Sequence, residues 1–245
     1  MKKSKLKDGK TPVVMLMTPQ VRIVLNEQFY LRDPQETELG RKIISKSIVM
    51  IDKLGIEDFT FAKLAQEIGS TEASVYRYFE NKHRLLIYLV SWYWAWLDYL
   101  LIFRTNNIYD PEHRLNIVIN IISESHKDDP ASSWIDESLL HRVVINEANK
   151  LFLTKHVDEE NKEGLFVHHK IFVQKIAETI LEYAPDYPYS RSLASMLVDE
   201  AHRQVFLAHH LPSLTDFKSS DDVSQKIENF ISQVMFSAIN PYKKR

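Results

Sequence analysis

The side chains best suited to chemistry in this sequence gather between positions 60 and 82. They comprise four hydroxyl groups, two cations and one carboxylate: Thr60, Thr71, Glu72, Ser74, Tyr76, Arg77 and Lys82. Hydroxyls and cations bind phosphate oxygens, arginine also reads the edge of guanine, and a carboxylate accepts a hydrogen bond from cytosine. The combination predicts contacts with nucleic acid rather than the making or breaking of a covalent bond.

The apolar residues of the same stretch predict two short helices joined by a tight turn. Thr60 is the expected N-cap of the first helix and Gly69 its end. Between them, one apolar face recurs at helical spacing: Phe61, Leu64, Ala65 and Ile68. Ser70 or Thr71 caps the second helix.

The second helix has the character of a helix that enters a DNA groove. Val75 and Phe79 point inward, whereas Ala73 and Ser74 are small and face outward. A helix fits the major groove by width, and base edges there carry a distinguishable pattern of donors and acceptors. The pattern therefore predicts a helix-turn-helix.

This segment resembles the helix-turn-helix of the TetR family of transcriptional regulators, and the likeness extends over about residues 39–86. The matching positions are Thr60, Ala65, Gly69, Tyr76-Arg77-Tyr78-Phe79 and Lys82. The resemblance implies that Thr60 and Lys82 contact phosphates and that Tyr76 presses against the DNA backbone. It also implies base or phosphate contacts for a second set: Thr71, Glu72, Ser74 and Arg77.

Two residues depart from the family pattern. Glu72 stands where many members carry lysine or another non-acidic residue, and a carboxylate there repels phosphate although it suits a helix N-terminus. Arg84 replaces the acid that would complete a capping box after Asn81. The alternative function is therefore a helical interaction protein of the same fold that has lost DNA binding.

The chain divides into three expected segments: an N-terminal extension at 1–34, the helix-turn-helix domain at 35–81 and a larger helical domain at 82–245. The extension combines a basic tail with β-prone residues, which form a hairpin, an extended arm or a segment packed on its own domain. With only 5 glycines and 9 prolines, the chain favours long helices over a sheet. We expect an all-α fold, in which the larger domain has helices at 82–105, 111–127, 134–157, 165–183, 189–210 and 221–239.

Aromatic residues crowd the long helix at 82–105. Four of them share one face: Trp92, Trp96, Tyr99 and Phe103. Trp134, Glu137 and His141 follow at helical spacing and could give a pocket its polar groups. We expect this set to line a pocket for an apolar or planar effector, a small molecule not identified by the sequence. Core packing of the long helix is the alternative.

Two broad apolar stripes close the chain and predict a homodimer. The candidate interface residues are Leu193, Leu197, Val205, Phe230 and Val234. Two recognition helices about 34 Å apart read a palindrome, whereas a single one reads too few bases. Burial of both stripes within one subunit is the alternative. The expected function is a repressor that binds a palindromic operator in double-stranded DNA and is released by the effector.

Several other classes of protein are disfavoured. The absence of cysteine excludes disulfides and cysteine-based zinc sites or nucleophiles. Phosphate-binding glycine loops and hydrolase motifs are also missing. His202 and His209 share a helix face but lie roughly 10 Å apart along its axis, too far to share one metal ion. We therefore expect no enzyme activity, no metal or cofactor, no membrane association and a cytoplasmic location.

Overall fold

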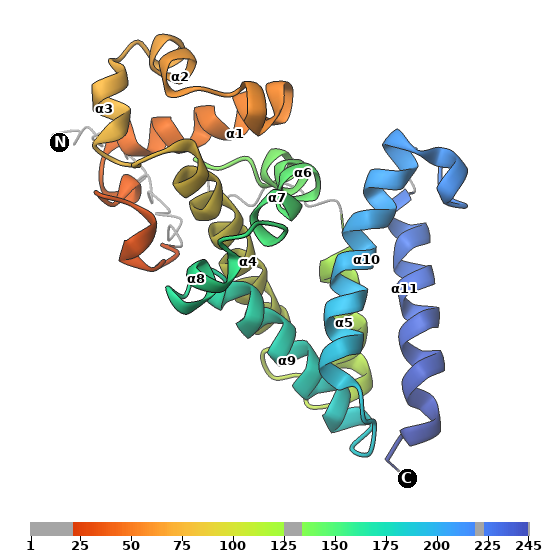
Figure 1. The fold of residues 1–245 in the computed structure, drawn as a ribbon. Helices are drawn as coiled ribbons and strands as arrows, with labels where there is room; N and C mark the ends of the chain where they lie inside the picture. The colour runs from red at the N-terminus through yellow and green to blue at the C-terminus, as the bar shows by residue number, and fades with distance from the viewer. Residues whose placement is uncertain (1–21, 125–133, 219–222, 245) are drawn as a thin grey trace, which may run out of the picture.

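A computed structural model describes residues 22–124, 134–218 and 223–244 of the chain, and its regular elements are helices (Figure 1). No strand occurs within these residues, and the all-α expectation is confirmed. A compact group of three helices lies at one end, and longer helices extend away from it toward the C-terminus (Figure 1).

The N-terminal group contains α1 (Glu38–Asp58), α2 (Phe61–Ile68) and α3 (Glu72–Tyr76). Thr60 and Thr71 are the N-caps of α2 and α3, and each side chain accepts a hydrogen bond from the N–H three residues further on. Gly69 ends α2 in the left-handed conformation, with φ of 66°. Val75 and Phe79 are fully buried. Local sequence signals therefore predict this unit correctly.

Residues 22–36 pack on the helix-turn-helix as an irregular arm. The arm contains two short 3₁₀ helices, η1 (Glu27–Phe29) and η2 (Pro34–Glu36), and its β-prone residues form no strand. Its buried residues are Ile23, Leu25, Phe29 and Pro34. The N–H of Leu31 donates to the carbonyl of Tyr78 at 2.8 Å. The basic tail, Lys2 to Lys10, lies outside the described residues.

A glycine allows the arm to approach α1 closely. A Cβ atom at Gly40 would lie 2.3 Å from the carbonyl oxygen of Pro34 and 2.6 Å from its Cα. Real Cβ atoms do not tolerate such distances, so only glycine fits without a shift of the backbone.

The long helix α4 (Lys82–Thr105) connects the two parts of the molecule. The side chain of Asn81 accepts a hydrogen bond from the N–H of Arg84 at 2.9 Å and starts the helix as predicted. By length and composition alone, α4 could cross a membrane, although its sequence contains no unbroken apolar run of that length. However, 78% of its apolar window is buried inside the protein, as in the core helix of a folded domain.

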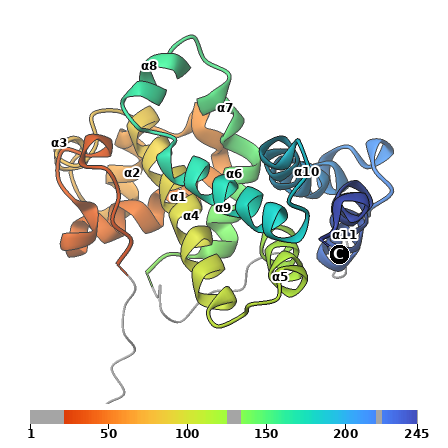
Figure 2. The same ribbon diagram turned by 90° about the horizontal axis from the view of Figure 1, so that it is seen from below.

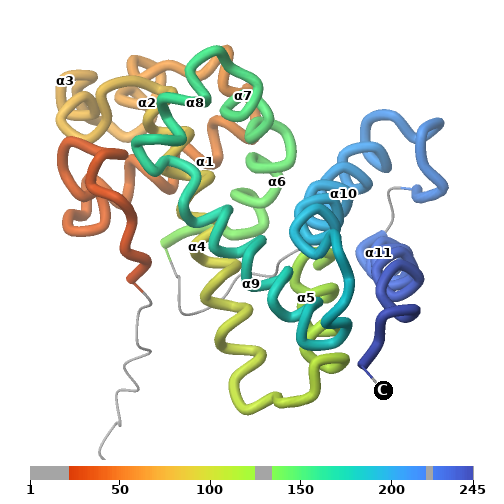
Figure 3. Tube along the Cα trace, turned by 60° about the horizontal axis from the view of Figure 1, so that its bottom comes forward, coloured from red at the N-terminus to blue at the C-terminus, as the bar shows by residue number. Residues whose placement is uncertain are grey.

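The remaining helices pack around α4 and beside one another: α5 (Pro111–Ser123), α6 (Glu137–Glu147), α7 (Asn149–Phe152), α8 (Val157–Lys162), α9 (Val167–Tyr183), α10 (Ser190–His210) and α11 (Val223–Ile239). Helix α9 lies against both α4 and α10, and α11 lies beside α10 and α5 (Figure 2). Figure 3 shows α10 and α11 side by side, on the opposite side of the molecule from α3.

The expected helix at 134–157 is wrong in its extent. The structure contains two shorter helices there, α6 and α7, and a break before α8. The stretch from Asp158 onward, expected to interrupt the helix, instead forms most of α8. Its acidic residues stand in the first turn, where the helix dipole favours negative charge, and this compensates for the missing side-chain cap.

Candidate nucleic-acid interface

Helix α3 presents its polar side to solvent. Val75 on its inner side has no exposed surface, whereas Thr71, Glu72 and Arg77 are exposed and Ser74 is half-buried. The hydroxyl oxygens of Thr71 and Ser74 lie 2.8 Å apart and share a hydrogen bond. The structure thus gathers four predicted contact residues around one short helix.

Tyr76 is held in place by a neighbouring ring and still remains accessible. Its ring packs edge-on against Phe61 with centroids 5.0 Å apart, and 46% of the residue is exposed. Phe61 in turn packs against Phe59. Thr60, which precedes Phe61, is exposed at the start of α2. Both residues are therefore positioned to touch a large partner.

The ammonium group of Lys82 is occupied within the protein. Its Nζ donates to the carbonyl oxygens of Ile56 at 2.9 Å and Glu57 at 2.8 Å, at the end of α1. Lys63 likewise donates to the carbonyl of Asp58 at 2.8 Å. Cations stabilise the negative end of the helix dipole there. A phosphate near Lys82 would therefore be contacted by the backbone N–H groups in the N-terminal turn of α4 rather than by the ammonium group.

Arg77 and Glu72 are the unpaired charges of α3. Neither forms an ion pair or a hydrogen bond with any part of the chain that the structure describes. A guanidinium group in this state keeps all its donors for a phosphate or a guanine edge.

The arm places a further cation beside α3, which the sequence analysis did not single out. The guanidinium carbon of Arg32 lies 5.6 Å from the centroid of the Tyr78 ring, within the range of a cation–π contact. Tyr78 is only 2% exposed, and its hydroxyl lies 2.7 Å from that of Thr37. No local signal could reveal Arg32, because its position depends on how the arm docks on α3.

A histidine–carboxylate hydrogen bond and an ion pair hold the start of α4 against α8. His83 Nε2 lies 2.5 Å from an oxygen of Glu160, and Arg84 lies 3.1 Å from an oxygen of Glu163. Arg84, which departs from the capping box, is therefore engaged with the larger domain. These contacts connect the helix-turn-helix end of α4 to the segment after α7.

The predicted pocket residues mostly serve packing. Trp92 and Trp96 stack with centroids 6.4 Å apart, and Trp134 packs edge-on against Trp92. Tyr99 and Phe103 stack further along α4, where Phe103 is 67% exposed. None of these rings lines the space between α6, α7 and α10 or the groove between α9 and α10.

The core beneath α4 contains a polar cluster. The hydroxyl of Tyr93 lies 2.7 Å from Nδ1 of His141 and 3.1 Å from Nε2 of His202. Burial, and then the proximity of His141 and His169, lowers the pKa of His202 well below its usual value. Glu137, also predicted as a polar pocket residue, is fully buried nearby in α6. Across the described ranges, no three potential ligands are grouped to hold a metal ion.

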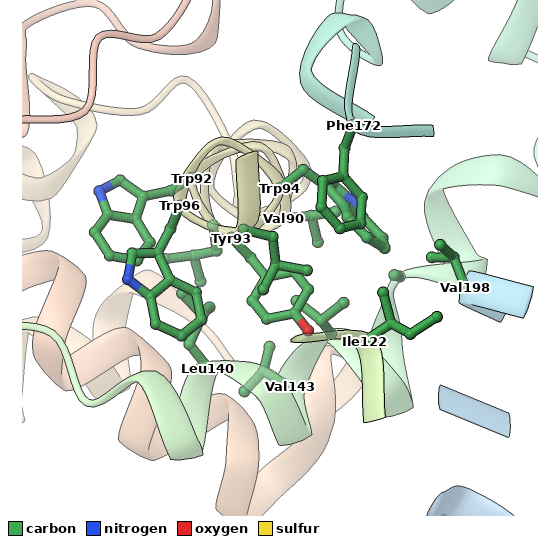
Figure 4. Packing of buried hydrophobic residues seen from close by; sticks show 14 of the residues in the cluster. Val90, Trp92, Tyr93, Trp94, Trp96, Ile122, Leu140, Val143, Phe172 and Val198 are labelled. Atoms are coloured by element: carbon green, nitrogen blue, oxygen red, sulfur yellow. The ribbon is translucent and has the colours of Figure 1, made fainter. Parts of the chain in front are cut away.

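A cavity of about 370 Å³ opens on the other side of α4, between α6, α7 and α10. Figure 4 shows Trp94 on the opposite side of α4 from Trp92 and Trp96. The lining residues are Trp94, Val144, Ile145, Asn146, Ala148, Asn149, Phe152, Asp199, His202, Arg203 and Phe206. Of these residues, His202 was considered only as a metal ligand, and Trp94 was not predicted, although it lies two residues from both Trp92 and Trp96.

The wall of this cavity that α6 and α7 form also touches the helix-turn-helix. Arg142 on α6 pairs with Asp52 on α1 through two hydrogen bonds of 2.9 and 2.8 Å. Lys150 on α7 lies 2.8 Å from Glu147 and 3.5 Å from Glu57. The cavity and the candidate DNA surface are therefore linked by one helix pair.

Two of the five predicted dimer residues are buried within the chain, and the other three are partly exposed. Leu193 and Leu197 are 5% and 1% exposed, and the other three, Val205, Phe230 and Val234, are half-buried against the core. Helix α11 covers this face of α10. An open groove of about 700 Å³ lies instead between α9 and α10. Ile171 of α9 lines this groove and is exposed.

Comparison with known families gives one match over part of the chain. Residues 43–89 match the model for bacterial regulatory proteins of the tetR family. The segment includes most of α1, all of α2 and α3 and the start of α4. No curated protein matches the sequence.

Solved structures share the whole fold at low sequence identity. A transcriptional regulator from Rhodococcus sp. Rha1 is 13% identical with a TM-score of 0.60, and the match covers 87% of this chain and 100% of that one. The ketosteroid transcriptional regulator KstR2 of Mycobacterium tuberculosis is 13% identical with a TM-score of 0.56, covering 85% and 97%. AibR, solved in complex with isovaleryl coenzyme A and operator DNA, is 15% identical with a TM-score of 0.53, covering 81% and 98%. At such identities the likeness concerns the fold alone.

Proposed function

Since the chain carries the helix-turn-helix domain of the TetR family of bacterial regulatory proteins, we propose that it is a repressor that binds a palindromic operator as a homodimer. The family match and the similar structures concern regulators rather than enzymes. The observation that carries the proposal is α3: its apolar side is anchored in the core, and its exposed side offers an unpaired Arg77.

Selection of bound sequences from random double-stranded DNA tests this proposal. We expect a palindromic consensus for the unmodified chain. Arg77→Ala should weaken operator binding by about 1–3 kcal/mol and relax preference at one position in each half-site. Lys243→Ala removes the same charge at the far end of the molecule, where Lys243 pairs with Glu112, and serves as the control. If both substitutions weakened DNA binding equally, Arg77 would contribute only a general attraction between opposite charges and no sequence recognition.

A second function, a helical interaction protein without DNA binding, is favoured by the charges around α3. Glu72 is exposed, and the ammonium groups of Lys63 and Lys82 are turned to the end of α1. A gel shift at low salt separates the two functions, because non-specific phosphate attraction is strongest there. No shift under these conditions would favour the interaction protein.

The groove between α9 and α10 supports a homodimer. Leu193 and Leu197 of the predicted stripe are buried within the subunit, whereas Ile171 on α9 is 39% exposed and lines the open groove. Burial of such a face in a helix bundle across a two-fold axis removes apolar surface from water. Ile171→Arg should yield a monomer in sedimentation velocity. Leu153→Arg, at a residue 85% exposed and outside the groove, should leave the dimer intact.

The cavity beside Trp94 is the place where we expect the effector. Its α6 and α7 wall reaches α1 through Arg142 and Lys150, so a ligand that prefers one arrangement of this wall shifts the population of helix-turn-helix positions. Operator release by such a ligand is expected from the same proposal. A cytoplasmic location follows from the proposed operator partner.

A further inference from the structure

The cavity between α4, α6, α7 and α10 has the size of a site for a small metabolite. Its volume is about 370 Å³, at the lower end of the range of roughly 300–1,000 Å³ for small-molecule sites. This size is sufficient for a compact metabolite.

Three aromatic rings from three helices contribute to the lining: Trp94, Phe152 and Phe206. Trp94 is only 3% exposed, and its indole N–H has no hydrogen-bond partner among the described residues. His169 stacks on the indole with centroids 4.2 Å apart and planes at 15°, which fixes the orientation of the ring. The cavity is therefore lined by apolar ring surface from three helices.

Two opposite charges stand one helical turn apart at this cavity. Asp199 and Arg203 both belong to α10 and both line the cavity. Neither pairs with the other or with any residue in the described parts of the chain. Partial burial raises the pKa of the Asp199 carboxyl, because desolvation disfavours its charged form.

The remaining polar groups of the lining are neutral. The lowered pKa of His202 keeps its ring uncharged near neutral pH, and the ring is held by the hydroxyl of Tyr93 at 3.1 Å. Asn146 and Asn149 add amide groups that donate and accept hydrogen bonds. Arg203 and Asp199 are therefore the charges that select a ligand here.

We infer that this cavity binds a small zwitterion with an apolar body, of the class of α-amino acids with large apolar side chains. Arg203 receives the ligand carboxylate and Asp199 its ammonium group, while the apolar body lies against Trp94, Phe152 and Phe206. A ligand with one charge would leave either Arg203 or Asp199 without a partner. The inference rests on the proposed function only where it names this zwitterion as the effector. Binding of the zwitterion to the cavity does not require DNA.

Three probes that share one phenyl body test the charge requirement by calorimetry on the full chain without DNA. Phenylalanine carries both charges, 3-phenylpropionate only the carboxylate and 2-phenylethylamine only the ammonium group. We expect phenylalanine to bind at least about tenfold more tightly than either analogue. Leucine and tryptophan extend the panel to other body sizes. Equal binding of all three phenyl probes, or no binding of any zwitterion of the panel at millimolar concentration, would overturn the inference.

Two isosteric substitutions give a crossed pattern. Arg203→Gln should weaken phenylalanine and 3-phenylpropionate and leave 2-phenylethylamine unchanged. Asp199→Asn should weaken phenylalanine and 2-phenylethylamine and leave 3-phenylpropionate unchanged. Both residues are exposed, so the variants should fold, and Lys53→Gln, an exposed substitution on α1 outside both the cavity and the groove, is the control. A change in the monomer–dimer equilibrium without a change in ligand preference would assign the two charges to the subunit interface instead.

The regulatory role is measured separately. Phenylalanine is added to a gel shift with a selected operator. Binding in the calorimeter without operator release would leave the zwitterion site standing and refute its role as effector. A failed gel shift in the absence of ligand would refute the proposed regulator and leave the calorimetric result untouched.

Discussion

Arg142 on α6 and Asp52 on α1 form a two-point ion pair, in which Nε and Nη2 of the arginine donate to the two carboxylate oxygens at 2.9 and 2.8 Å. The hydrogen bonds to Asp52 raise the pKa of Arg142. The pair connects the larger domain to the helix-turn-helix. The planar guanidinium group of Arg142 fixes the relative orientation of the two side chains.

A double-mutant cycle with Arg142→Ala and Asp52→Ala measures the strength of this link. We expect a coupling free energy of about 0.5–1 kcal/mol, because the side chain of Arg142 is 52% exposed and solvent screens the pair. Urea denaturation of the four proteins gives the value. The pair of Lys46 and Glu67, at 3.7 Å within the helix-turn-helix, should show a smaller coupling. A coupling of zero for Arg142 and Asp52 would contradict the link.

Glu72→Gln should strengthen binding to non-specific DNA at low salt. The carboxylate is exposed at the start of α3 and unpaired in the described structure, so its removal eliminates a repulsion from phosphate. Glu67→Gln is the matched control, because Glu67 lies on α2 and pairs with Lys46. Fluorescence anisotropy at several salt concentrations separates the two variants. If Glu72→Gln weakens binding to one operator sequence only, the carboxylate reads a base instead.

Gly40→Ala should destabilise the protein by about 1–3 kcal/mol through the clash with Pro34. The gain in helix propensity, up to about 1 kcal/mol, is too small to offset it. Hydrogen exchange at the N–H of Leu31, which donates to Tyr78, should accelerate as the arm loosens. Lys53→Ala, an exposed substitution on the same helix, should change stability by no more than about 0.5 kcal/mol. Unchanged exchange at Leu31 would show that the arm tolerates the methyl group.

Stability should fall as the pH drops from about 6.5 toward 4. Burial lowers the pKa of His169 to about 4, whereas an unfolded histidine titrates near 6.5. The unfolded chain therefore binds more protons in this window, and its free energy falls by roughly 1.4 kcal/mol per pH unit for each such histidine. His169→Phe, which retains a ring beside Trp94, should reduce the slope by about one proton. His113→Gln at an exposed position should not, and an unchanged slope in His169→Phe would contradict the assignment.

The helix-turn-helix could be predicted in detail because its determinants are local. The caps at Thr60 and Thr71 and the left-handed Gly69 act within a few residues of their own position. The use of Lys82 could not be predicted in the same way. Its ammonium group reaches carbonyls at the end of α1, 23 to 26 residues earlier in the chain, and only the packing of α1 against α4 brings them together.

The side of α4 that borders the cavity was beyond local inference for a related reason. Trp92, Trp94 and Trp96 are all almost fully buried, so helical periodicity cannot distinguish a packed side from one beside an empty space. Which side stays open depends on where α6, α7 and α10 lie. The stripe with Leu193 and Leu197 was similarly ambiguous, since an apolar face does not reveal whether its partner belongs to the same chain.

The helix pair α6–α7 borders the cavity on one side and holds α1 through Arg142 and Lys150 on the other. Thermodynamic linkage makes any influence between the two ends reciprocal. Whatever factor a molecule in the cavity applies to operator affinity, the operator applies to the affinity for that molecule. Protein bound to operators and protein free in the cell would then respond at different effector concentrations, so that the number of operator copies becomes a determinant of sensitivity.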